Sequence, residues 1–200
     1  KAAKLTVVPL KGWKRSMTFD KTGMPWVLPS PHIPQPATAF DYPATGILGE
    51  LYYVSIGVGY TLPFQLICAD WIDADKFAER MNALNLPGTK FRPIHVKPFY
   101  GTGKGENLQG VQFYVDDVPG SSLTLIQFYA MQELAKLYPE KRIFDTATDK
   151  SRFDMFDKVC GTDKIRSLFS KNYQVSDMID YWNKDVDAFK EKAKKYYLYK

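Results

Sequence analysis

The stretch Phe64-Gln-Leu-Ile-Cys-Ala-Asp-Trp-Ile-Asp-Ala-Asp-Lys-Phe-Ala-Glu-Arg-Met81 contains the clearest change of pattern in the chain. Residues 64–69 form a short apolar run, which is typical of a buried strand. Asp73 then occupies the position expected of a helix N-cap, and apolar residues recur after it at helical spacing until Pro87-Gly88 ends the pattern. The sequence therefore predicts a buried strand that leads directly into an amphipathic helix.

Two β-rich runs follow this helix and are joined by a glycine-rich connection. Phe91–Val96 contains Pro93, which lacks a backbone N–H and therefore favours the edge of a sheet. Gly110–Val115 is the second run, and we expect the two to pair as an antiparallel hairpin with a long loop. The connection, Gly101-Thr-Gly-Lys-Gly105, is a poor match to a nucleotide-binding P-loop, because Lys104 is not followed by Ser or Thr and no helix begins behind it.

The rest of the chain predicts one more strand and several helices. Leu5–Leu10 is β-rich. Ala37–Gly49 predicts a short helix interrupted by Pro43, residues 121–138 predict an amphipathic helix, and the remainder after Phe144 shows only helical spacing. The order of elements predicts a single α+β domain over residues 1–200, with a mixed, largely antiparallel sheet of about four to five strands covered by helices and a helical C-terminal third.

Composition narrows the classes of partner. Apolar residues make up 45% of the chain and charged residues 24%, which excludes wholesale disorder. Aromatic residues reach 15%, so we expect some rings on a surface, where they stack on sugars, bases or peptides. The formal charge of +5 lies mostly at the two chain ends and favours anionic partners only weakly. Because the basic residues do not interleave with aromatic residues in one stripe, no nucleic-acid partner is expected.

Cysteine and histidine are scarce. Cys68 and Cys160 provide neither a disulfide framework nor a Cys-based metal site. His32 and His95 lie far apart in the sequence and cannot form a zinc site by themselves, and His95 is predicted to be a half-buried strand residue. No apolar run has the length of a membrane span. We therefore expect no metal, no cofactor and no membrane span, in a chain that starts like a mature product or a piece of a longer protein.

A proline-rich segment is the first candidate for a binding site. Pro25–Pro34 contains four prolines in ten residues, so it must be a stiff loop. It carries Trp26, Ser30 and His32, which suits the wall of a binding cleft. A structural wrap over a sheet edge explains the same composition equally well.

Glu50 is the carboxylate best placed for chemistry. It follows Gly49 and precedes two tyrosines, where partial burial would favour its protonated form and suit a general acid. A solvated surface glutamate is the alternative. Farther on, Gly57 and Gly59 flank Val58 and predict a close approach of backbone segments.

Several segments, in chain order, resemble the C-terminal half of the NamZ-type exo-β-N-acetylmuramidases, which are peptidoglycan-recycling hydrolases. These segments are Leu5-Thr-Val-Val-Pro-Leu-Lys-Gly-Trp-Lys-Arg-Ser16, Pro25-Trp-Val-Leu-Pro-Ser-Pro31, Gly57-Val-Gly-Tyr-Thr-Leu-Pro-Phe64, Ala69-Asp-Trp-Ile-Asp73, Phe91-Arg-Pro93, Gly110-Val-Gln112 and the closing Lys-Tyr-Tyr-Leu-Tyr199.

The resemblance implies a division of labour between two domains. In the family, a Rossmann-like N-terminal domain carries the catalytic glutamate, and the C-terminal domain closes the cleft that binds a terminal N-acetylmuramic acid. This chain would then be an accessory half, inactive alone, whose partners are the N-terminal catalytic domain of the same polypeptide and a peptidoglycan-derived sugar, in a periplasmic or secreted location. The implied cleft residues are Trp26, Ser30, His32, Glu50, Tyr53 and Lys104, with Glu50 the candidate for a catalytic role.

The chain also departs from the family pattern. Five positions differ. An asparagine is replaced by His32 and another by Tyr53, a glutamate is replaced by Ile56, and two arginines are replaced by Val58 and Leu62. The two missing guanidinium forks would each suit the carboxylate of a lactyl-bearing sugar, so their loss argues against that substrate. It also favours an alternative, a non-catalytic carbohydrate-binding or protein-interaction domain.

Overall fold

The computed structural model describes residues 3–147 and 150–199, which form two compact units. The larger unit is Leu28–Trp182, and the smaller unit joins Lys1–Val27 to Asn183–Lys200. None of the helices in the described part of the chain is long and apolar enough to cross a bilayer.

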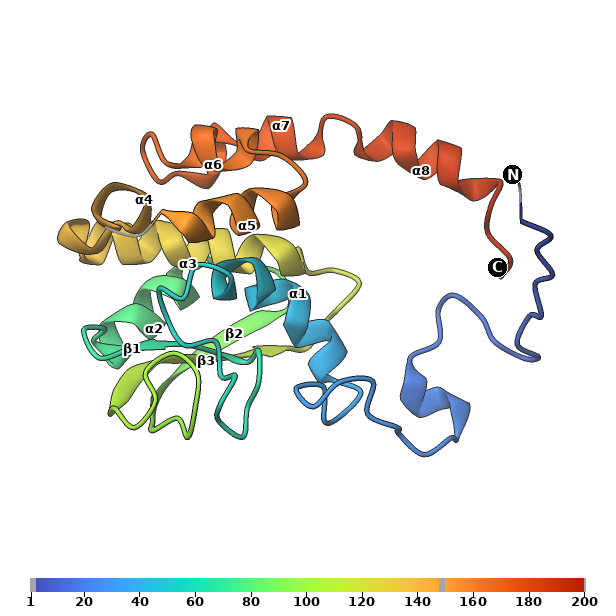
Figure 1. Ribbon diagram of the computed structural model, residues 1–200, viewed down its shortest axis with the longest axis horizontal. Coiled ribbons are helices and arrows are strands. Elements are labelled where there is room, and N and C mark those ends of the chain that lie inside the picture. Colours follow the sequence, from blue (N-terminus) through green and yellow to red (C-terminus); the bar gives the residue numbers. More distant parts are fainter. Residues whose placement is uncertain (1–2, 148–149, 200) are drawn as a thin grey trace. The chain divides into compact units, whose positions relative to one another are not determined.

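A three-stranded antiparallel sheet lies in the larger unit (Figure 1). β3 (Leu108–Val115) is central and pairs with β1 (Leu66–Ala69) on one side and β2 (Thr89–Val96) on the other. The predicted buried strand, the hairpin and the edge position of Pro93 are confirmed. The α+β class is also confirmed. The predicted sheet was largely antiparallel with about four to five strands, whereas the described sheet has three strands and is antiparallel throughout.

Leu5–Leu10 accounts for part of this difference, because it forms no strand. Its β-prone residues lie in the smaller unit, where no described segment forms a hydrogen-bonded ladder with them. Side-chain preference alone does not make a strand, because the ladder hydrogen bonds need a neighbour.

The two faces of the sheet are covered differently. Ile67, Val111 and Phe113 are buried in the main core, together with residues of the helices. On the other face, Leu66 and Leu108 belong to a smaller apolar cluster. Figure 1 shows helices on the first face and the loops before β1 and between β2 and β3 on the second. The irregular, glycine-containing segments are therefore gathered on one side.

The helices follow the predicted pattern. Asp73 caps α2, since its carboxylate accepts a hydrogen bond of 3.1 Å from the Lys76 N–H. The C-terminal third is helical, as expected. The α-helices are α1 (Thr38–Gly49), α2 (Ala74–Ala83), α3 (Leu123–Leu137), α4 (Ile143–Thr146), α5 (Ser151–Cys160), α6 (Lys164–Phe169), α7 (Ile179–Asn183) and α8 (Val186–Lys194), with short 3-10 turns at η1 (Phe19–Thr22), η2 (Pro139–Lys141) and η3 (Val175–Asp177).

α1 runs through Pro43 rather than breaking there. The buried side chain of Gln127, on α3, contacts α1 on both sides of this position. Its amide nitrogen donates to the Pro43 carbonyl at 2.9 Å, and its amide oxygen accepts from the Leu48 N–H at 2.9 Å. One side chain thus satisfies two backbone groups of α1 and holds that helix against α3.

Gln127→Leu tests this contact. The leucine has similar bulk but leaves one donor and one acceptor of α1 unpaired, so we expect the free energy of unfolding to fall by about 2–4 kcal/mol. Urea denaturation of the variant measures it, with Gln35→Leu at an exposed position as the control. Equal losses in both variants would show that Gln127 is not specifically required.

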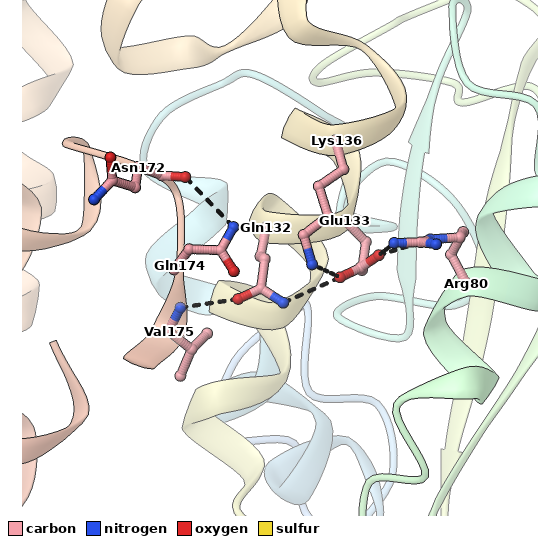
Figure 2. A network of polar contacts seen from close by, with 7 residues as sticks. All are labelled: Arg80, Gln132, Glu133, Lys136, Asn172, Gln174 and Val175. Carbon is pink, nitrogen blue, oxygen red and sulfur yellow. Dashed lines mark hydrogen bonds and ion pairs between the residues drawn. The ribbon is translucent and has the colours of Figure 1, made fainter. Parts of the chain in front are cut away.

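A second polar network joins α2, α3 and η3 (Figure 2). Glu133 has a side chain only 2% exposed. Its two oxygens accept from Lys136 Nζ at 2.7 Å and from Arg80 Nε at 2.8 Å. The neighbouring Gln132 donates to Glu133 at 3.0 Å and accepts from the Val175 N–H at 2.9 Å. The buried carboxylate is therefore fully engaged by donors from two helices.

This network predicts a pH-dependent stability. Burial alone would raise the pKa of Glu133, but hydrogen bonds from Lys136, Gln132 and Arg80 outweigh it and lower the pKa below its usual value. A lowered folded-state pKa contributes stability that is complete above about pH 5 and is lost as the pH falls through the folded-state pKa.

Glu133→Gln should therefore cost about 2 kcal/mol at pH 7, with a smaller cost near pH 3, because part of the stability that the ionised carboxylate contributes is lost as the pH falls. Denaturation curves at both pH values measure this difference. Glu79→Gln, an exposed carboxylate on α2, is the control and should change little. A cost for Glu133→Gln that does not depend on pH contradicts the assignment.

Candidate functional site

Two loops meet on the face of the sheet that the helices leave open. Gly57 and Gly59 adopt positive φ angles of 86° and 96°, and the Phe99 N–H donates to the Gly59 carbonyl at 2.7 Å. A Cβ at Gly59 would lie 1.8 Å from the Tyr100 carbonyl oxygen, and one at Gly57 would lie 2.0 Å from that of Leu62. The predicted close approach of backbone is confirmed, and it holds the segment after β2 against the loop before β1.

A cavity of about 240 Å³ opens where α1 ends against these loops. Its walls are mostly apolar, and two tyrosines with exposed fractions of 52% and 64%, Tyr42 and Tyr52, stand among them. Glu50 supplies the carboxylate. The lining residues are Tyr42, Gly46, Gly49, Glu50, Tyr52, Val54, Ile56, Val58, Phe64, Gly101 and Thr102.

Arg152, from the first turn of α5, holds Glu50 in place. Its Nη2 lies 2.5 Å from Glu50 Oε2, and its Nε donates to the Glu50 carbonyl at 2.7 Å. The guanidinium carbon also lies 4.2 Å from the centre of the Tyr52 ring. The carboxylate beside the cavity is thus ion-paired and oriented, with its other oxygen available to accept from a ligand hydroxyl. Sequence reasoning missed Arg152, because no local motif marks a residue that meets its partner from 102 positions away.

His32 reaches the same loop, but neither His32 nor Ser30 lines the cavity. His32 Nε2 lies 2.7 Å from the hydroxyl of Tyr100, which directly precedes the lining residues Gly101 and Thr102. Ser30 Oγ accepts from the His32 N–H at 3.4 Å. The proline-rich loop is therefore attached next to the cavity through one histidine–tyrosine contact.

The structure places Tyr53 away from this cavity. Its hydroxyl donates to the Lys141 carbonyl at 2.6 Å, and its ring centre lies 5.3 Å from that of Trp71. Burial raises the pKa of Tyr53. These contacts tie the loop after α1 to η2, while the preceding Tyr52 lines the cavity instead.

Neither Lys104 nor Trp26 is among the residues that line the cavity. Lys104 is exposed in the glycine-rich loop, where its N–H donates to the Gly101 carbonyl at 3.2 Å. Trp26 belongs to the smaller unit and packs edge-on against Phe19, with ring centres 4.8 Å apart. Their predicted binding roles remain predictions.

A polar chain fixes the start of α1 to the sheet. Buried Asp41 accepts from Gln65 Nε2 at 2.9 Å, and burial raises the pKa of Asp41 to about 6. Gln65 accepts from Gln112 at 3.2 Å, and Gln112 accepts from Arg92 Nη2 at 2.6 Å. Because Glu50 follows the last residue of α1, this anchoring helps to set its position.

A second, more open cavity of about 480 Å³ lies beside β2 and β3. His95 and Lys97 line it. His95 is exposed, so the prediction of a half-buried side chain was wrong; it lies near the end of the edge strand β2, opposite Gln109. Among residues 3–147 and 150–199, no three His, Cys, Asp or Glu side chains are placed to hold a metal ion.

Gly59→Ala tests the contact between the loops that wall the main cavity. The methyl group would overlap the Tyr100 carbonyl, so we expect a loss of at least about 3 kcal/mol in unfolding free energy. Gly105→Ala is the matched control, because its φ of 77° is similarly unfavourable for alanine but nothing lies within 4 Å. It should cost only about 1 kcal/mol. Similar losses in the two variants would contradict the close approach.

Comparisons with known proteins agree with one another. The family model described as exo-beta-N-acetylmuramidase NamZ, C-terminal, matches residues 40–199, and the corresponding N-terminal model matches residues 1–37. The peptidoglycan beta-N-acetylmuramidase NamZ of Bacillus subtilis (strain 168) is 37% identical over 197 residues, which are 98% of this chain and 46% of the relative.

A solved structure is similar as well. The crystal structure of a DUF1343 family protein from Bacteroides fragilis NCTC 9343 matches with a TM-score of 0.92 and 55% identity over 94% of this chain and 49% of that one. The chain thus spans about half the length of the relatives it matches.

Proposed function

The chain belongs to the NamZ family of exo-β-N-acetylmuramidases, and on that premise we propose that it is the C-terminal, cleft-completing part of a peptidoglycan glycosidase. The reaction would be hydrolysis of a terminal β-linked N-acetylmuramic acid during cell-wall turnover. The observation that carries the proposal is the tyrosine-flanked cavity next to an ion-paired glutamate, within the region that matches the family.

The cavity has the chemistry of a partial sugar site. A pyranose ring has apolar faces that pack on aromatic rings and hydroxyl groups that bond to charged side chains. Its volume of about 240 Å³ lies just below the range of about 300–1,000 Å³ typical of complete ligand pockets. That size suits one wall of a cleft that a second domain completes.

Glu50 and Arg152 would orient the substrate rather than donate the proton. A glycosidase needs an acid and a second group that stabilises positive charge at the sugar. Glu50 is occupied by a guanidinium, so we assign the acid to the preceding domain. Val58 and Ile56 make the cavity wall apolar, so the guanidinium that would pair with the lactyl carboxylate is that of Arg152, which is bonded to the lining residue Glu50.

The chain alone would then be inactive. It would act together with the preceding domain of the same polypeptide on a peptidoglycan-derived sugar. We place this reaction in a periplasmic or secreted location, because that is where the substrate is found. Ser30, His32 and Tyr100 would form the outer part of the same wall.

The test is release of N-acetylmuramic acid from a chromogenic muramide by the full-length polypeptide. We expect Glu50→Gln and Arg152→Lys to lower kcat/KM by about tenfold to hundredfold, since each removes part of one charge-assisted contact. Asp154→Asn, an exposed carboxylate on the same helix as Arg152, is the control and should match the wild type. Unchanged turnover in both variants would remove this pair from the mechanism, and release by the 200-residue chain alone would contradict the accessory role.

A non-catalytic carbohydrate-binding domain is the second candidate, favoured by the apolar residues Ile56 and Val58 in the cavity. Calorimetric titration of the chain and of the full-length polypeptide with muropeptides separates the two. Binding without cleavage by either protein supports the second candidate.

A further inference from the structure

The smaller unit buries none of its described residues, 3–27 and 183–199. Val8 is 87% exposed, and Phe189, on α8, is 68% exposed. Leu5, Leu10 and Leu198 are exposed as well. A folded protein rarely leaves so many large apolar side chains in water without a partner to cover them.

The two segments of the smaller unit are tied together. The Leu10 N–H donates to the hydroxyl of Tyr199 at 2.7 Å. The guanidinium of Arg15 lies 3.8 Å from the centre of the Tyr197 ring. Any partner that covers the N-terminal segment will therefore meet the C-terminal tail as well.

The residues of this unit indicate what kind of partner surface would cover it. Leu5-Thr-Val-Val8 has strand-forming residues and no ladder, so its backbone can add to an open sheet edge. In α8, Val186, Phe189 and Ala193 fall on one face, which suits an apolar groove. The described residues of the unit carry ten Lys or Arg against four Asp or Glu, which favours an acidic surface.

The comparisons show where such a partner would come from. Residues 1–37 match the model of the N-terminal half of the family, whereas α8 falls in the part matched by the C-terminal model. The relatives are about twice as long as this chain. Residues 1–37 match the N-terminal family model, yet several large apolar side chains of this segment are exposed here. A surface of the N-terminal domain would cover them.

We propose that the smaller unit is a docking element for the preceding domain: residues 5–10 add to the edge of its sheet, and α8 packs its Phe189 face on the same domain. The C-terminal tail would thus be structurally part of the first domain's surface, although its sequence matches the second. The inference depends on the proposed function only in requiring a preceding domain, and not on any sugar or reaction.

Backbone hydrogen exchange, followed by mass spectrometry, tests the proposal in the full-length polypeptide and in the 200-residue chain. We expect amides of Thr6–Val8 and of α8 to exchange at least about tenfold more slowly in the full-length protein. Phe189→Ala in the full-length protein should restore fast exchange in α8. Glu191→Ala is the matched control, because alanine is equally favourable to the helix and Glu191 lies on the opposite face.

Equal exchange rates in the two proteins, or no effect of Phe189→Ala, overturns the proposal. If protection from exchange in the 200-residue chain increases with its concentration, the partner is a second copy of the chain. That result overturns the proposal too. Unchanged protection of β3 in each variant shows that the larger unit is folded. A full-length protein that protects both segments but releases no muramic acid supports docking while contradicting the proposed function, so the two failures are distinguishable.

Discussion

The buried amide of Gln127 is the contact on which the geometry of the site depends. α1 contains Pro43, which lacks a backbone donor, so the Ala39 carbonyl one turn earlier loses its helical partner. Gln127 bonds on the other side of the proline, to the Pro43 carbonyl and the Leu48 N–H, and thereby holds to α3 the end of α1 that leads to Glu50 beside the cavity. At the other end of the helix, Asp41 is bonded through Gln65 to the sheet. The helix that carries the candidate carboxylate is thus fixed at both ends by buried polar contacts, which are costly to leave half-made.

The unequal cover of the sheet explains why the cavity is built from loops. Helices bury one face, and the other is closed by two glycine-containing loops packed on a small apolar cluster. Such loops can approach closely only where side chains are absent: a Cβ at Gly59 would collide with the Tyr100 carbonyl, and one at Gly57 would lie 2.0 Å from the Leu62 carbonyl oxygen. The same contact that brings Gly101 to the cavity wall also brings Tyr100 to His32. Rigid elements and tightly packed loops together therefore position the side chains around the cavity.

The features that depend on neighbouring residues in the chain could be predicted from the sequence. The strand and capped helix of residues 64–83, the hairpin and the C-terminal helices follow from local spacing, and all are present. What failed depends on distant partners. Leu5–Leu10 has strand-forming residues but no neighbouring strand in the described chain, and the side chain that bonds to the Pro43 carbonyl in α1 comes from a residue 84 positions away. The choice between Tyr52 and Tyr53 at the cavity depends on the direction of one turn after α1, which composition does not encode. Glu50 could be named as a candidate from its local sequence. Its partner Arg152 could not, because the two residues are far apart in the chain.

If the cavity is one wall of a cleft between two domains, as proposed, the ion pair of Glu50 and Arg152 would help to keep that wall stable before the cleft closes. An isolated carboxylate or guanidinium at a partly apolar wall would be poorly solvated and costly. Paired, and with the guanidinium also bonded to the Glu50 backbone carbonyl, both groups keep their charges in a fixed geometry. A ligand carboxylate would compete for a guanidinium that already has a partner, so the gain from that contact is an exchange and is small by itself. Selectivity would then arise when a second wall excludes water from the cavity and strengthens every polar contact inside it. The Glu50–Arg152 pair is preformed and neutral overall. The cost of removing water from it would therefore arise only when the second wall closes the cleft.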